Sequence, residues 1–226
     1  MSESLFIAIE GGDGSGKGTQ ANLLTSHLKK RGREVLKLSF PQYEKPSSYF
    51  ATEYLNGNYG GINEVHPDLA SLAFALDRFA AKPTILEALQ GGQDIILDRY
   101  VASNLAHQGA KIDVEANRHS FYERIMNTEF NILGIPKPTH SIVLLVPPEQ
   151  SQLNVDKKAE RTYTTKKRDI HEVDKNHLAL AKANYEQLCQ LFPNEFIPIN
   201  CMDGEKMRSI ADIHSQILEI IEDLYK

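Results

Sequence analysis

Nine residues near the amino terminus have the types and the spacing that suit phosphate binding. Glycines are interspersed there with one lysine and three small polar residues, in the order Gly11, Gly12, Asp13, Gly14, Ser15, Gly16, Lys17, Gly18 and Thr19. Glycine allows positive φ angles and a close approach of the backbone, so the N–H groups of such a loop can point at phosphate oxygens. The lysine is placed to reach the terminal phosphates of a nucleotide. We therefore expect these nine residues to bind ATP, with Lys17 as a catalytic residue.

The residue after the lysine departs from the usual pattern of this loop. A serine or threonine normally stands there and offers its hydroxyl to Mg²⁺, whereas this sequence has Gly18. Either the hydroxyl ligand is missing, or water replaces it, or Thr19 supplies it. Thr19 is our candidate metal ligand on this side of the site.

A phosphate loop by itself is compatible with several classes of protein, including GTPases, motor ATPases, transporters and small-molecule kinases. A GTPase would carry an Asn-Lys-x-Asp segment that reads guanine, and the sequence has none. Motor ATPases are usually larger or carry further domains. A compact chain with a highly charged segment in its second half favours a small-molecule kinase.

A second group of polar residues, Asp98-Arg99-Tyr100, follows a short apolar run. In an open parallel sheet the carboxyl ends of the strands face the ligand crevice, so this group should lie near the phosphate loop. Asp98 can then approach Mg²⁺, and Arg99 can clamp a phosphate with two hydrogen bonds. The alternative is that Asp98 and Arg99 form a purely structural ion pair.

These residues need a scaffold, and the apolar pattern predicts one. Five short apolar runs read as buried strands, at 5–9, 34–40, 94–97, 141–146 and 196–200. The segments between them read as helices, at 17–30, 48–55, 67–90, 98–133, 149–192 and 206–225. Pro83 should kink or interrupt the long helix over 67–90. Strands that alternate with helices predict an α/β fold with a five-stranded parallel sheet covered by helices on both faces.

Composition limits the kinds of partner. The chain has 226 residues, of which 41% are hydrophobic and 24% charged, which fits one globular domain over 1–226. A net charge of −5 offers no basic field for a phosphate backbone, so we expect no nucleic-acid partner. Cys189 and Cys201 lack the spacing of a zinc or redox site. We find neither a membrane-spanning run nor a signal peptide, and we expect a cytoplasmic protein without a membrane partner.

The order of these motifs resembles the thymidylate kinase family of nucleoside monophosphate kinases along nearly the whole chain. The resemblance rests on Ile9-Glu-Gly-Gly-Asp-Gly-Ser-Gly-Lys-Gly-Thr-Gln20, Phe40-Pro41, Phe74-Ala-Leu-Asp-Arg78, Asp98-Arg-Tyr-Val-Ala-Ser-Asn104 with Gln108-Gly109, Pro147-Pro-Glu149, and Asp169-Ile-His-Glu-Val-Asp174. It implies transfer of a phosphoryl group from ATP to dTMP with Mg²⁺, held by Thr19 and Asp98, and it implies a homodimer.

The resemblance also implies roles for individual residues. Asp13 would lie near the sugar 3′-hydroxyl and the acceptor phosphate, which Arg99 would hold as a catalytic residue. Phe74 would stack on thymine, and Arg78 would donate to a carbonyl of the base. The remaining residues expected to bind substrate are Phe40, Pro41, Ser103, Asn104, His107 and Gln108.

A basic segment after the fourth strand resembles the lid of this family, and we place it at about 153–172. Between 157 and 168 it has six basic residues and one acidic residue. Phosphoryl transfer needs positive charge over the moving group and exclusion of water. Family members without an arginine in the phosphate loop carry the catalytic arginine in the lid, which makes Arg161 and Arg168 the candidates. The alternative is a solvated charged helix.

The sequence departs from the family pattern at four positions. Gln42 follows Phe40-Pro41 where many members have arginine, and His107 stands where tyrosine is common. His140 stands near a frequent aspartate, and Gly18 is more typical of adenylate kinases. Two alternative functions stay open: a kinase for another monophosphate such as dUMP or dGMP, or a nucleotide-binding regulatory module with weak turnover.

Overall fold

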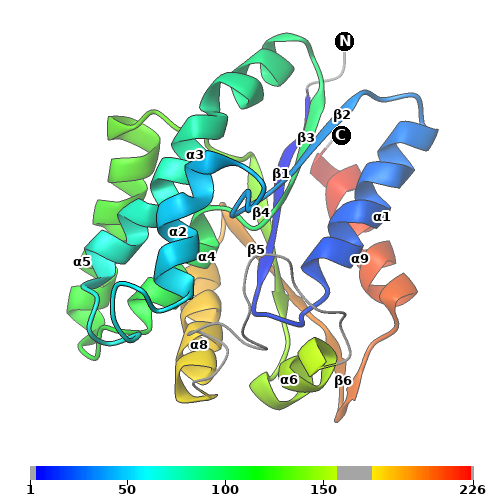
Figure 1. Ribbon diagram of the computed structural model, residues 1–226. Coiled ribbons are helices and arrows are strands. Elements are labelled where there is room, and N and C mark those ends of the chain that lie inside the picture. The colour runs from blue at the N-terminus through cyan, green and yellow to red at the C-terminus, as the bar shows by residue number, and fades with distance from the viewer. Residues whose placement is uncertain (1–3, 157–174, 225–226) are drawn as a thin grey trace.

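Five short strands form one parallel sheet in the computed structural model, which describes residues 4–156 and 175–224 (Figure 1). The strands are β1 (Phe6–Gly11), β2 (Val35–Ser39), β3 (Asp94–Asp98), β4 (His140–Leu145) and β5 (Phe196–Asn200). Their order across the sheet is β2-β3-β1-β4-β5, and each neighbouring pair is parallel. Each predicted apolar run therefore forms a strand of this sheet.

Alternating side chains of the sheet pack into two layers of helices. In β1, Phe6 and Ala8 join one apolar cluster, and Ile7 and Ile9 join the other. The first cluster contains residues of α3 (Pro67–Gln90), α4 (Val101–Gly109), α5 (Glu115–Met126) and α8 (Lys175–Leu191). The second contains residues of α1 (Lys17–Lys30) and α9 (Ile210–Leu224). Figure 1 shows the two layers on opposite sides of the sheet, so the predicted fold class is confirmed.

The long helix α3 has the predicted bounds, but it continues through Pro83. The expectation of an interruption there is wrong. Proline removes the hydrogen bond to the carbonyl group four residues earlier, which belongs to Phe79. Phe79 is 43% exposed and Pro83 is also exposed, so water can bind this carbonyl oxygen in place of the missing N–H.

The remaining elements connect these layers. The short elements are η1 (Pro46–Ser48), α2 (Tyr49–Leu55), the π-helical turn η2 (Asn127–Ile132) and α6 (Pro148–Asp156). The predicted terminal helix over 206–225 begins later than expected, because Met202–Asp203 and Lys206–Met207 form a two-stranded hairpin, β6 and β7. Ser209 sets the start of α9, since its Oγ accepts a hydrogen bond from the N–H of Asp212 at 3.1 Å.

The strand register brings the two predicted motifs together. Ile9 of β1 lies beside Asp98 of β3, so both strands end at the same edge of the sheet. The chain leaves β1 into the phosphate loop and leaves β3 into α4 through Arg99. Residues that are more than 80 positions apart in the sequence therefore meet at this edge, as expected for parallel strands.

Candidate active site

The phosphate loop connects the end of β1 to the first turn of α1. Gly14 and Gly16 have φ angles of 76° and 93°, which residues with side chains rarely adopt. A Cβ atom at Gly14 would also lie 2.2 Å from the carbonyl oxygen of Ser151. Lys17 is 6% exposed, and its Nζ donates to the carbonyl oxygen of Gly12 at 2.5 Å. The lysine therefore lies folded over a loop whose conformation requires glycine.

The carboxylate of Asp98 lies against the first turn of α1. A Cβ atom at Gly18 would be 2.9 Å from Oδ2 of Asp98, so the carboxylate occupies the side on which a serine would carry its hydroxyl. Thr19 is exposed at the next position. Within residues 4–156 and 175–224, no group of three or more His, Cys, Asp or Glu side chains could hold a metal ion. Metal roles for Asp98 and for Thr19 stay predictions.

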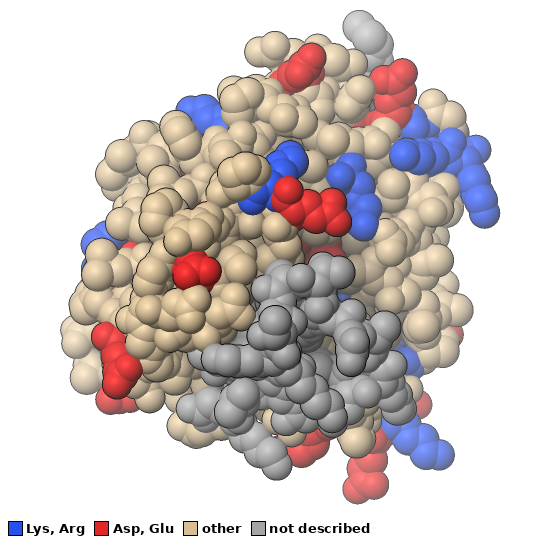
Figure 2. Space-filling view, in the orientation of Figure 1, with Lys and Arg blue, Asp and Glu red and all other residues tan. Residues whose placement is uncertain are grey.

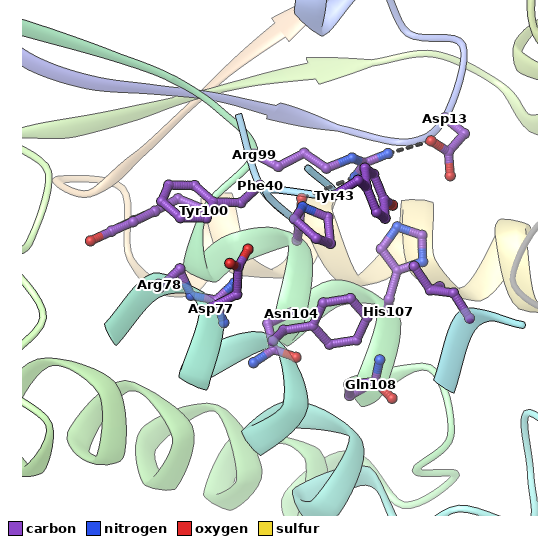
Figure 3. A pocket seen from close by; sticks show the side chains of 14 residues that line it. Asp13, Phe40, Tyr43, Asp77, Arg78, Arg99, Tyr100, Asn104, His107 and Gln108 are labelled. Carbon is purple, nitrogen blue, oxygen red and sulfur yellow. Dashed lines mark hydrogen bonds and ion pairs between the residues drawn. The ribbon is translucent and has the colours of Figure 1, made fainter. Parts of the chain in front are cut away.

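Arg99 reaches from the end of β3 toward the phosphate loop. Its Nη1 donates to the carbonyl oxygen of Gly11 at 3.3 Å and to Oγ of Ser103 at 3.0 Å, while Nη2 pairs with Asp13 (Figure 3). The φ angle of Arg99 is 67°, a left-handed conformation that non-glycine residues seldom adopt. The guanidinium is thus fixed at the edge where an acceptor phosphate would bind.

A pocket opens beside this arginine, and all ten residues predicted to bind substrate line it. They are Asp13, Phe40, Pro41, Phe74, Arg78, Arg99, Ser103, Asn104, His107 and Gln108. Four residues not predicted also line it, namely Tyr43, Leu55, Asp77 and Tyr100. Figure 3 shows the Asp13–Arg99 pair on the side of the phosphate loop and Arg78 with Asn104 on the other side. The pocket therefore has a phosphate end and a second end, which we call the base end.

A buried ion pair anchors the base end. Nε and Nη2 of Arg78 each donate to a carboxylate oxygen of Glu129 at 2.6 Å, and both side chains are at most 3% exposed. Nδ2 of Asn104 donates to the carbonyl oxygen of Ser71 at 3.1 Å and to Glu129 at 3.0 Å. Only the NH₂ group can make these two bonds, so the amide orientation is fixed. Oδ1 of Asn104 and Nε2 of Gln108 are then buried without a hydrogen-bond partner among the described residues.

A family model described as thymidylate kinase matches residues 9–195. The chain belongs to the thymidylate kinase family. A thymidylate kinase from Mycobacterium tuberculosis strain H37Rv is 39% identical over 148 residues, which are 64% of this chain and 67% of that protein. A Pyrococcus horikoshii protein named probable thymidylate kinase is 30% identical over 221 residues, 96% of this chain and 95% of the relative. The solved structure of thymidylate kinase from Candida albicans has a TM-score of 0.71 at 24% identity, covers 99% of this chain and 93% of that one, and supports the same fold.

Gln42, which replaces a common arginine of the thymidylate kinase family, is bound to Asp77 in this chain. The backbone N–H of Gln42 donates to Oδ2 of Asp77 at 2.7 Å, and Nε2 lies 3.3 Å from Oδ1. Ser47 donates to the same carboxylate at 2.5 Å. Gln42 therefore helps to fix the segment after Pro41 against α3, and it brings no charge to the phosphate end.

His107, which stands where this family commonly has tyrosine, is buried between the pocket and α8. Its Nδ1 lies 3.4 Å from Nε2 of His177, and the two residues are 5% and 4% exposed. Burial lowers the pKa of His107 well below its usual range, and His177 and Arg99 lower it further. The imidazole is therefore neutral near pH 7.

The predicted lid falls largely outside the described residues. Residues 153–156 belong to α6, whereas 157–172, with Arg161 and Arg168, are among the residues that the structure does not describe. The catalytic roles of these two arginines stay predictions. No helix among the described residues is long and apolar enough to cross a membrane.

Asp77, which lines the pocket, and Glu129, which binds a pocket residue, were not predicted, for different reasons. Asp77 belongs to the segment Phe74-Ala-Leu-Asp-Arg78, so its position beside Arg78 was a usable signal. Glu129 lies in a polar stretch without any motif and reaches Arg78 only through the packing of η2 against the long helix. No pattern in the sequence marks Glu129 as the partner of a pocket residue.

Proposed function

We propose that this protein transfers the γ-phosphoryl group of ATP to dTMP and releases ADP and dTDP. Membership of the thymidylate kinase family supports the kinase reaction. One observation carries the choice of acceptor: the pocket is lined at its base end both by the guanidinium of Arg78 and by Asn104, whose Oδ1 is buried without a partner among the described residues. This pair matches a base that offers a carbonyl oxygen next to an N–H group.

Thymine has such an edge, formed by O4 and N3–H. Arg78 has only donors, and its Nε and Nη2 are used by Glu129, so Nη1 is the nitrogen that would meet O4. Oδ1 of Asn104 would accept from N3–H and so gain its missing partner. Cytosine reverses this edge, because it presents an amino group to Arg78 and an unprotonated nitrogen to Oδ1. We therefore expect the site to reject dCMP.

An aromatic side chain of the pocket supports the same assignment. Phe74 lines the pocket and meets the ring of Tyr54 edge to face, with centroids 5.9 Å apart and an interplanar angle of 87°. This contact orients the Phe74 ring, and we propose that its face stacks on the base.

Two alternative acceptors share part of this chemistry. Uracil has the edge of thymine without the 5-methyl group, and guanine is larger but also has a carbonyl next to an N–H. A regulatory nucleotide-binding module is the third alternative. The joint presence of Lys17, Asp98 and Arg99 at one sheet edge favours an enzyme, because these groups suit charge stabilisation during phosphoryl transfer.

The residues of the phosphate end would act by positioning and by charge. ATP phosphates would bind the N–H groups of Gly11–Thr19, and Lys17 would stabilise the charge on the γ-phosphoryl group as a dTMP phosphate oxygen attacks it. Arg99 would hold the acceptor phosphate, and Asp13 would face the sugar 3′-hydroxyl. Mg²⁺ suits the carboxylate of Asp98 together with phosphates and water, and would neutralise phosphate charge. We also propose that Arg161 and Arg168 add positive charge over the transferred group.

We propose that the protein acts as a homodimer. Apolar side chains that are at least 38% exposed recur along one stripe of α3, at Leu69, Leu72, Leu76, Phe79 and Leu86. In Figure 2 the surface over α2 and α3 carries few charged side chains. A second copy that packs on this stripe would cover it, and the molar mass measured in solution by light scattering tests this proposal.

We also propose a cytoplasmic location without a nucleic-acid partner. Cys189 and Cys201 are free and buried, which suits a reducing compartment. On the face in Figure 2, basic and acidic side chains are interspersed, without a broad basic surface.

The test is an ADP-release assay with ATP, Mg²⁺ and a panel of dTMP, dUMP, dGMP and dCMP, with the diphosphate product identified by chromatography. We expect dTMP to be the best acceptor and dTDP to accumulate with ADP in equal amounts. A clear preference for dGMP would reject the thymine assignment and keep the kinase reaction. Absence of ADP release with every acceptor would favour the regulatory module.

A further inference from the structure

Glu10 is a buried carboxylate to which the sequence assigns no role and which does not line the pocket. It lies in β1 directly before the phosphate loop and is 0% exposed. Its Oε1 accepts a hydrogen bond from the backbone N–H of Tyr100 at 2.7 Å, and its Oε2 accepts one from Oγ of Ser103 at 2.6 Å. Both contacts lead to the strand end that carries Arg99.

The first contact holds the backbone beside Arg99. Arg99 has a φ angle of 67°, which is unfavourable for a residue with a side chain and persists only where the surroundings impose it. The N–H of Tyr100 belongs to the peptide group directly after this residue. Glu10 therefore holds the peptide group between Arg99 and Tyr100. This contact helps Arg99 to keep its left-handed conformation.

The second contact holds the guanidinium of Arg99. Oγ of Ser103 accepts hydrogen bonds from Nη1 of Arg99 at 3.0 Å and from the hydroxyl of Tyr185 at 2.9 Å. Arginine has no acceptor and a carboxylate has no donor, so the single proton of Ser103 must point at Glu10. Glu10 thereby turns the lone pairs of Ser103 toward Arg99 and Tyr185.

We infer that Glu10 is a positioning residue for Arg99, acting on its backbone through Tyr100 and on its guanidinium through Ser103. The inference rests on the proposed function insofar as Arg99 holds the acceptor phosphate. Burial raises the pKa of Glu10, whereas Ser103, Arg99 and the N–H of Tyr100 oppose that rise. The hydrogen bonds from Ser103 and Tyr100 and the positive charge of Arg99 favour the charged carboxylate that the network requires.

The test is a double-mutant cycle in the full-length protein with Glu10→Gln and Arg99→Ala. Glutamine keeps the size but replaces one accepting oxygen with an NH₂ group, so either the Ser103 hydroxyl or the N–H of Tyr100 loses its acceptor, and one of the two contacts to Arg99 is lost. Glu10→Gln should lower kcat/KM for the monophosphate by about 10- to 100-fold, as is typical of residues that orient a functional group. The KM for ATP should stay near the wild-type value. In the Arg99→Ala background, Glu10→Gln should cause almost no further loss.

Two further variants keep the result decisive. Asp94→Asn removes another buried carboxylate of the sheet, which binds Arg33 and the N–H of Leu5 at the opposite strand end, and its effect should multiply with that of Arg99→Ala. If Glu10→Gln does not fold, Ser103→Ala removes the hydroxyl through which Glu10 acts on the guanidinium, and the same double-mutant cycle is measured for Ser103→Ala and Arg99→Ala.

Multiplicative losses for Glu10 and Arg99, or a folded Glu10→Gln variant with normal kcat/KM, would overturn the inference. The cycle is measured on whichever monophosphate the wild-type protein uses best. If the wild-type protein prefers another monophosphate, the dTMP assignment is rejected, but the double-mutant cycle still tests the role of Glu10.

Discussion

The phosphate end and the base end of the pocket are built in different ways. At the phosphate end, a continuous loop from Gly11 to Thr19 supplies backbone groups, and Lys17 bonds to that same loop. At the base end, Arg78 of α3, Asn104 of α4 and Glu129 of η2 meet from three separate elements. The first end depends on local backbone geometry, and the second depends on the packing of helices.

This difference predicts different consequences of mutation. At the base end the buried charge of Arg78 is paired with the carboxylate of Glu129, so loss of that carboxylate should weaken the fold as well as the recognition of the base. The lysine of the phosphate end lies on a loop beside an open site, so its loss should slow the reaction and leave the fold intact. Variants at the base end should thus lower the free energy of unfolding, whereas variants at the phosphate end should lower kcat.

Glu129→Gln should produce the largest loss of stability. It leaves the buried Arg78 charge without its carboxylate, which typically costs about 3–5 kcal/mol. Urea denaturation measures the change in the free energy of unfolding. The control is Glu222→Gln, which breaks the exposed Arg31–Glu222 pair and should cost about 0–1 kcal/mol. Equal effects of the two variants would contradict the structural role of the buried pair.

Lys17→Met should lower kcat by about 100-fold or more, because a group that stabilises transition-state charge typically contributes that much. The free energy of unfolding should stay close to that of the wild type, in contrast to Glu129→Gln. Steady-state kinetics at saturating ATP and dTMP measure the loss. A variant with near-normal kcat would remove the phosphate-loop interpretation.

His107 lies between the two ends and should make stability depend on pH. Its pKa is held well below the ordinary 6.5 by burial, so below about pH 6.5 the unfolded chain binds a proton that the folded protein does not. The stabilisation is complete above that pH and decreases as the pH falls, by about 1.4 kcal/mol per pH unit for one proton. His107→Gln should flatten the dependence measured by urea denaturation between about pH 5 and 7. Parallel curves for the two proteins would exclude this residue as the source.

Gly18→Ser should have the smallest effect. The new hydroxyl would lie beside Asp98 and offer a further ligand, worth about 1 kcal/mol or about fivefold in the Mg²⁺ concentration for half-maximal activity. The matched control is Gly18→Ala, which adds the same Cβ atom without the hydroxyl. Identical Mg²⁺ dependence of the two variants would place the cation away from this side of Asp98.

The sequence predicts the phosphate end well, because the end is local. A glycine run after an apolar strand constrains the backbone wherever it occurs, and Asp98 and Arg99 follow a strand whose carboxyl end must share an edge with the loop. The helix over 67–90 follows equally from its apolar positions. The predicted interruption at Pro83 is wrong because the cost of a proline depends on whether the freed carbonyl group meets solvent, whereas a kink there stays a prediction.

The sequence predicts which residues line the base end, but it does not predict the hydrogen bonds that hold them. Family motifs name Phe74, Arg78 and Asn104, but the bond that holds Arg78 comes from Glu129, which carries no motif. Glu10 directly precedes the phosphate loop, but the sequence assigns it no role because its partners lie 90 and 93 residues away. Hydrogen bonds between distant residues are a property of the packed fold.

The central claim is that Arg78 and Asn104 read the edge of thymine, and the ratio of kcat/KM for dTMP and dCMP tests it most directly. Sites matched to a hydrogen-bonding edge reject the wrong edge by about 10⁴-fold, so dCMP should be far poorer than dTMP. The 5-methyl group acts through packing alone, worth about 1–3 kcal/mol, so dUMP should lie between them. Arg78→Ala should reduce the ratio of kcat/KM for dTMP to that for dCMP, because it lowers kcat/KM for dTMP. Equal use of dTMP and dCMP by the wild-type protein would contradict this account.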